Sequence, residues 1–185
     1  MTFSRFRREE REVSIKNLVL TIVFWSLSLA MILLIFILSS IPVNETQNLT
    51  DFLTATIIDS NGININANDR VLLSSIGHVL EFGILTVFAY LAISSTNKIS
   101  VSTSYAESPI KILKSDNEMN IIFTLWFTIL NAIFDEYHQL FVEGHTGGVI
   151  DLCKDIIGII IVLLLIRIIF TISLKVRGKH EIRYT

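Results

Sequence analysis

The chain has 185 residues, of which 51% are hydrophobic, and its mean hydropathy is +0.62. This composition indicates a small integral membrane protein with about four spans, and it leaves no room for a sizeable soluble domain. The formal net charge is only −2, and the single cysteine, Cys153, excludes an internal disulfide and any metal site made of thiolates alone.

The first predicted transmembrane helix follows a basic segment. Residues 1–17 carry several arginines, and residues 18–38 form an apolar run without a charge. That run is longer than the roughly 7–15 apolar residues of a secretory signal peptide, and the sequence after it matches a cleavage site poorly. We therefore expect a cytoplasmic N-terminal segment and an uncleaved first span.

Three further spans are predicted downstream, with polar segments between them. The polar segments are an acidic loop at 42–74, a lysine-containing loop at 97–118 and a glycine-rich turn at 143–148. The spans are expected at about 76–93, 121–142 and 149–174, and a basic tail follows at 175–185. In the third of the four spans the apolar run, Ile121–Phe134, has fourteen residues, fewer than the roughly 20 that crossing a bilayer requires. Its helix must therefore continue through the polar residues that follow.

The loop charges predict the orientation of the bundle. Both termini and the loop at 97–118 are rich in Lys or Arg, whereas the loop at 42–74 has one arginine and the turn at 143–148 has no basic residue other than a histidine. The positive-inside rule places both termini in the cytoplasm and that turn outside. The predicted fold is thus an all-α, polytopic bundle of four transmembrane helices spanning residues 18–174.

Polar residues from the last three predicted spans share one depth, near the outer face. The second span contributes His78 and Glu81, the third contributes Asp135, Glu136, His138 and Gln139, and the turn and fourth span contribute His145, Asp151, Lys154 and Asp155. Spacings of three and four residues place members of each group on a common helix face. Gly158, three residues beyond Asp155, would let another helix approach closely. Ionisable groups inside a membrane are costly and indicate a functional site by default.

We therefore predict one outward-facing polar pocket. The candidate catalytic residues are Glu81, Asp135, Glu136, Asp151 and Asp155, and the candidate binding residues are His78, His138, Gln139 and His145. His and carboxylate ligands could hold a divalent metal, as in a membrane hydrolase or transferase, although the spacing matches no standard zinc motif. Crowded carboxylates could also transfer protons or pass a cation. Alternatively, the polar groups satisfy one another and only fix the helix packing.

A set of residues from these spans carries a family resemblance. The set comprises His78 with Glu81-Phe82, then Asp135-Glu136, Gln139, Phe141 and Gly144, and finally Asp151, Asp155 and Gly158. From about Ser75 to Val162 the chain resembles the VanZ-like family of bacterial membrane proteins, named for a teicoplanin-resistance accessory protein. The resemblance implies a multi-span protein of the bacterial cytoplasmic membrane, linked in some members to glycopeptide resistance. We expect it to bind or process a cell-envelope or lipid-linked molecule, such as a precursor or glycolipid. The bilayer is a further expected partner, and nothing indicates nucleic-acid binding.

The turn before the fourth span departs from the family pattern. Relatives usually have Pro-Gly-Arg there, whereas this chain has Glu143-Gly144-His145. An arginine would supply a permanent charge that grips phosphate or carboxylate, and a histidine is titratable. The replacement weakens the case for an anionic ligand, and the more acidic pocket favours a cation or shared protons.

Overall fold

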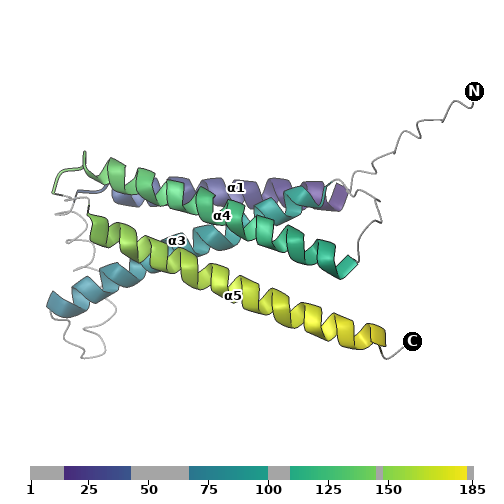
Figure 1. Cartoon of the computed structure of the whole chain (residues 1–185). Helices are drawn as coiled ribbons and strands as arrows, with labels where there is room; N and C mark the ends of the chain where they lie inside the picture. The colour runs from purple at the N-terminus through teal and green to yellow at the C-terminus, as the bar shows by residue number, and fades with distance from the viewer. Residues whose placement is uncertain (1–14, 43–66, 100–108, 145–147, 183–185) are drawn as a thin grey trace, which may run out of the picture.

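The computed structural model of the protein describes residues 15–42, 67–99, 109–144 and 148–182, and these residues form four α-helices and no strand (Figure 1). The helices are α1 (Ile15–Ser39), α3 (Ala67–Asn97), α4 (Pro109–Gln139) and α5 (Val149–Ile182). The all-α prediction is therefore confirmed for this part of the chain. The predicted basic segment up to residue 14, most of the acidic loop, and His145 lie outside the described residues.

The central helix of the bundle is α3. It packs against α1, α4 and α5, and α4 also contacts both α1 and α5. Within the described ranges α1 and α5 do not contact each other. In Figure 1 α3 crosses the other helices obliquely, and α1 begins at the same end of the bundle at which α5 ends.

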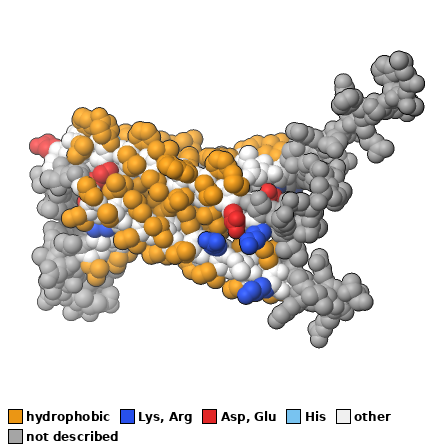
Figure 2. All heavy atoms as spheres, in the orientation of Figure 1, with side chains coloured by type: hydrophobic (Ala, Val, Ile, Leu, Met, Phe, Trp, Pro, Cys, Tyr) orange, Lys and Arg blue, Asp and Glu red, His pale blue; other side chains and the backbone are white. Residues whose placement is uncertain are grey.

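Three of the four described helices are long and apolar enough to cross a bilayer. These segments are Ile15–Ser39, Ser74–Asn97 and Val149–Val176. On α1 and α5 most of the large apolar side chains are exposed. Hydrophobic side chains cover much of the visible face of the bundle in Figure 2. A helix that is apolar on its outer as well as its inner side is typical of a membrane span. The helix α4 is not among the three, because polar residues occur near both of its ends.

The boundaries of α4 differ from the predicted third span at both ends. It begins at Pro109, inside the segment expected to be a loop, and a proline is tolerated in the first turn because its missing N–H would have no helical partner there. It ends at Gln139 instead of continuing to 142. Beyond that residue two backbone N–H groups bond three residues back, and Gly144 adopts a φ of 82°, which glycine reaches without steric cost.

The other spans are also longer as helices than predicted. The helix α3 begins at Ala67 and α5 continues to Ile182. Polar residues that flank a span can extend its helix into the interface, and a hydrophobicity pattern alone does not mark where such an extension stops.

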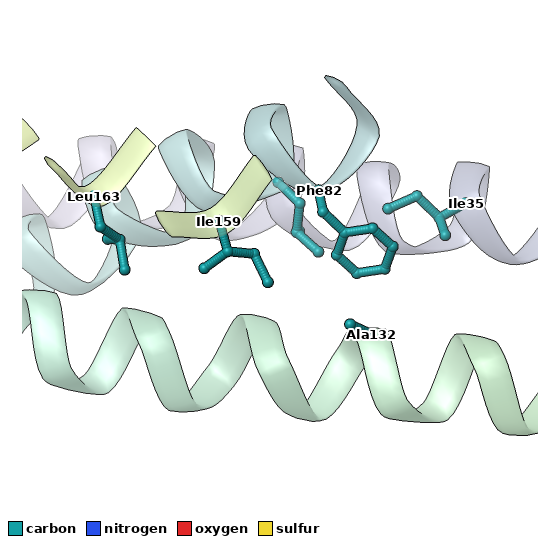
Figure 3. Close-up of a cluster of buried hydrophobic side chains, with 6 residues drawn as sticks. Ile35, Phe82, Ala132, Ile159 and Leu163 are labelled. Carbon is teal, nitrogen blue, oxygen red and sulfur yellow. The ribbon is translucent and has the colours of Figure 1, made fainter. Parts of the chain in front are cut away.

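A small apolar core lies where α3 meets its neighbours. Its buried members are Ile35, Phe82, Leu85, Ala132, Ile159 and Leu163 (Figure 3). Nearby, the backbones of α3 and α5 approach closely at Gly158, where an added Cβ would lie 3.0 Å from the Cα of Val79. The predicted close approach at this glycine is confirmed, and it sets the spacing of the two helices next to the polar residues described below.

Candidate functional site

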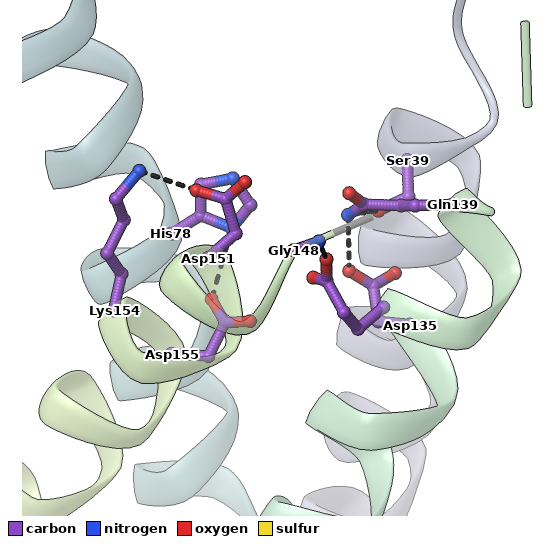
Figure 4. Close-up of polar contacts among 9 residues, drawn as sticks. Ser39, His78, Asp135, Gln139, Gly148, Asp151, Lys154 and Asp155 are labelled. Atoms are coloured by element: carbon purple, nitrogen blue, oxygen red, sulfur yellow. Dashed lines mark hydrogen bonds and ion pairs between the residues drawn. The ribbon is translucent and has the colours of Figure 1, made fainter. Parts of the chain in front are cut away.

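Polar side chains from all four helices gather near one end of the bundle, where α1 and α4 end and α5 begins (Figures 1 and 4). We call five of them the acidic cluster: Glu81 on α3, Asp135 and Glu136 on α4, and Asp151 and Asp155 on α5. The structure therefore brings together the carboxylates that the sequence placed at one depth. Three groups of contacts build the site.

The first contact joins α3 to α5. The Nδ1 atom of His78 lies 3.1 Å from Oδ1 of Asp155. The Asp155 side chain is fully buried, whereas that of His78 is 21% exposed. The second carboxylate oxygen of Asp155 has no hydrogen-bond partner among the described residues. Gly158 lies one turn further along α5. The close approach of α3 and α5 there keeps His78 and Asp155 within hydrogen-bond distance of each other.

The second contact joins α4 to α1. The Nε2 atom of Gln139 donates to Oδ2 of Asp135 at 2.9 Å and to the hydroxyl of Ser39 at 3.4 Å (Figure 4). The i,i+4 spacing of the two α4 residues places them on one face. Asp135 is only 7% exposed, and its Oδ1 atom lacks a partner within the part of the chain that the structure describes.

The third contact joins the end of α4 to the start of α5. Glu136 Oε1 accepts a hydrogen bond from the backbone N–H of Gly148, the residue before α5 (Figure 4). The Glu136 side chain is buried, and its Oε2 atom is unpartnered among the residues described. This bond brings the α4 carboxylates towards those of α5.

Glu81 connects the two sides of the site. It lies on α3 three residues after His78, half-buried, and close enough to interact electrostatically with His78, Asp135 and Asp155. In the same way, Glu136 is within electrostatic range of Asp135, Asp151 and Asp155. Each of the five carboxylates in the acidic cluster is therefore within electrostatic range of at least one other member.

One member of the cluster, Asp151, and the predicted site residue His138 lie at the edge of the site. Asp151 forms an ion pair with Lys154, and both side chains are partly exposed. His138 turns towards α1, where its Nε2 atom lies 2.9 Å from the hydroxyl of Ser40 and its ring stacks on Phe36 with centroids 4.2 Å apart. His138 therefore lies next to the acidic cluster, but its own contacts are with Phe36 of α1 and with Ser40.

Sequence reasoning missed the contribution of α1. Ser39 and Ser40 each bond to an α4 side chain of the site. Both serines end the first apolar run, at the depth of the cluster, so the same depth comparison could have found them. The residues grouped by depth in the sequence were charged residues, histidines and Gln139, and no hydroxyl was among them.

The donors among the described residues do not match a metal site. Within the described ranges, no group of three His, Cys, Asp or Glu side chains is placed to share one ion. Zinc sites take three or four protein ligands, and His78 with Asp155 supplies two. We therefore derive no step through a metal.

Three apolar helices of spanning length define a multi-pass helical membrane protein, and three of the five carboxylates gathered near one end of it are buried. Residues 24–170, most of the chain, match the VanZ/LLP1 family, and the chain belongs to that family. The resemblance seen in the sequence is confirmed. No curated protein and no solved structure matches the chain.

Proposed function

We propose that this protein is a four-span protein of the bacterial cytoplasmic membrane whose acidic cluster binds a polar group of a cell-envelope or lipid-linked molecule at the outer leaflet. Binding there would lower the sensitivity of the cell to glycopeptides such as teicoplanin. Membership of the VanZ/LLP1 family supports the link to glycopeptides. The geometry of the cluster supports the binding role.

The observation that carries the proposal is a set of buried, unsatisfied carboxylate oxygens. Asp135, Glu136 and Asp155 are 7%, 9% and 0% exposed, and each keeps one oxygen without a hydrogen-bond partner among the described residues. Leaving a buried polar group unpaired costs about 1–3 kcal/mol. Residues that only tied helices together would gain by pairing fully with one another. Free acceptors on three acids favour a bound donor or cation.

The distribution of side chains on α4 supports its role as a membrane span alongside α1, α3 and α5. Its buried side chains include Asn117, Asn120, Thr124 and Thr128, and its exposed ones include Ile122, Phe123, Trp126, Leu130 and Phe134. The polar residues that lower its hydropathy therefore face the bundle, where helices can satisfy them, and the apolar ones face outwards. A helix of 31 residues is also longer than the roughly 20 needed to cross.

The proposed orientation can be tested with single cysteines. In a Cys153→Ser background, Glu143→Cys should react with a membrane-impermeant maleimide on intact cells, because Glu143 is exposed and would face outwards. Lys98→Cys, in the exposed turn after α3, should react only after permeabilisation. The proposed orientation places residues 1–17 and 175–185 in the cytoplasm. The reverse labelling pattern would refute it.

The binding role can be tested with two isosteric variants and a matched control. Asp135→Asn and Glu136→Gln remove charge from the cluster, and Glu118→Gln removes an exposed charge near the other end of the same helix. We expect the wild type and the control to lower teicoplanin sensitivity and to carry an envelope molecule in native mass spectrometry. The two cluster variants should lose both properties while folding normally. If all four proteins behave alike, or if the cluster variants fail to fold and the wild type carries no ligand, the cluster is structural.

A further inference from the structure

An apolar groove of about 260 Å³ lies between α1, α3 and α4 and leads to the acidic cluster. It is lined by Ile32, Ile35, Phe36, Phe82, Leu85, Asn131, Phe134 and Asp135. Figure 3 shows Phe82 and Ile35 close together in the space that faces Ala132 of α4. Apart from Asn131 and Asp135, the groove offers only hydrocarbon surface.

The one charged residue of the groove lining, Asp135, is also a member of the acidic cluster. Asp135 is more than nine-tenths buried, its Oδ2 atom accepts from Gln139, and its Oδ1 atom has no partner within the described ranges. The terminal torsion of an aspartate is broad, so the carboxyl can turn its free oxygen towards the groove. A long apolar lining beside one unpaired acceptor complements a molecule with a hydrocarbon chain and a polar head.

We infer that the groove holds a single hydrocarbon chain of the molecule bound at the acidic cluster, and that this molecule's head carries an amine or a hydroxyl that donates to Asp135. The inference rests on the proposed function and specifies its ligand. An ionised carboxylate only accepts hydrogen bonds, so the head must supply a donor. A phosphate or carboxylate placed there would be repelled by Glu81, Glu136 and Asp155.

The size of the groove limits the apolar part of the ligand. Its 260 Å³ falls just below the roughly 300–1,000 Å³ of drug-sized pockets. One chain of moderate length therefore fits, and the paired chains of a phospholipid do not.

Affinity must come from the polar end. Lipid tails are as apolar as the leucines and isoleucines that line the groove, so moving a chain from the bilayer into the groove gains little hydrophobic free energy. A hydrogen bond to a charged group contributes about 1.5–3 kcal/mol. The affinity of the groove should therefore depend strongly on the head group of the ligand, and an alkane without a head group should bind weakly.

The test uses the full-length protein in nanodiscs with three probes: decylamine, decanol and decanoate, each with a diazirine on the chain. We expect the amine or the alcohol to label groove residues of α1, α3 and α4, and unlabelled probe to compete. Asp135→Asn should reduce this labelling about tenfold, because the head would then donate to a neutral amide oxygen instead of a charged carboxylate. Decanoate labelling the groove as well as decylamine does would overturn the inference.

A second variant tests the groove separately from the cluster. Ile32→Trp should fill the groove at a partly buried position and abolish labelling, while Leu34→Trp, on the exposed side of α1, should not. If Ile32→Trp and Leu34→Trp label alike while the cluster variants still lose teicoplanin protection, the groove inference fails and the proposed function stands. If the cluster variants keep that protection, the proposed function itself fails.

Discussion

Replacing Gly158 by alanine tests whether the α3–α5 contact next to the acidic cluster is as close as the structure indicates. A Cβ at this position would lie within 3.0 Å of the carbonyl oxygen of Val79, and 3.0 Å from its carbonyl carbon and its Cα. These are backbone atoms and cannot rotate away. The two helices must therefore separate, and the separation occurs one turn from Asp155 and beside His78.

The magnitude follows from comparison with Gly83→Ala. Gly83 lies on the same helix interface, but a Cβ there would meet Val162 Cγ2 at 3.5 Å, an ordinary contact. Both substitutions gain the same helix propensity, about 1 kcal/mol, so this gain cancels in the comparison. Overpacking then costs Gly158→Ala alone about 1–3 kcal/mol. At about 2–4 °C per kcal/mol for a chain of this size, the melting temperature should fall about 2–12 °C below that of Gly83→Ala.

The measurement is a thermal melt of both variants and the wild type in the same detergent, followed by size-exclusion chromatography with fluorescence detection. Gly83→Ala should melt at or slightly above the wild type. Equal melting temperatures for the two glycine variants would show that α3 and α5 are further apart than described, and the geometry of the His78–Asp155 pair would have to be abandoned with it.

Three further outcomes can be measured with the same melts. A double-mutant cycle with His78→Gln and Asp155→Asn should give a coupling of about 0.5–3 kcal/mol, since the residues are in contact, and additive effects would argue against the pair. Lys154→Gln should cost no more than about 1 kcal/mol because its ion pair with Asp151 is partly exposed, and a loss of several kcal/mol would place that pair in the core. Gly144→Ala should destabilise by about 1–2 kcal/mol because of the positive φ, and an unchanged melt would mean that the turn has another conformation.

The apolar spans could be predicted well because a charge-free run of sufficient length has few alternatives to a membrane helix. The first span, predicted at residues 18–38, corresponds to the helix Ile15–Ser39. The third was harder, since its polar residues are buried against other helices, as Asn117 and Asn120 are, and hydropathy along the chain does not record which side of a helix a residue faces. Its start at Pro109 was missed for that reason.

The depth of the site residues was predictable, but their partners were predictable only in part. Asp135 and Gln139, four residues apart, were expected to share a face, and they bond to each other. Glu136, which was expected to share a face with Gln139, bonds instead to the turn at Gly148. His138 was grouped with the cluster, yet it bonds to Ser40, the residue after the end of α1. Spacing within one helix specifies which residues are neighbours on it, but the rotation of that helix against the others decides which neighbour each one meets.

The central place of α3 affects how freely the sequence can vary. Since α3 packs more extensively against the other three helices than any of them packs elsewhere, and α1 and α5 do not meet within the described residues, a substitution on α3 changes contacts with several neighbours at once. Side chains on the outer surfaces of α1 and α5 would contact only lipid, so one apolar residue type can replace another there. Among related proteins, drift should therefore be slowest along α3, and a library of random changes should lose most of its folded members there.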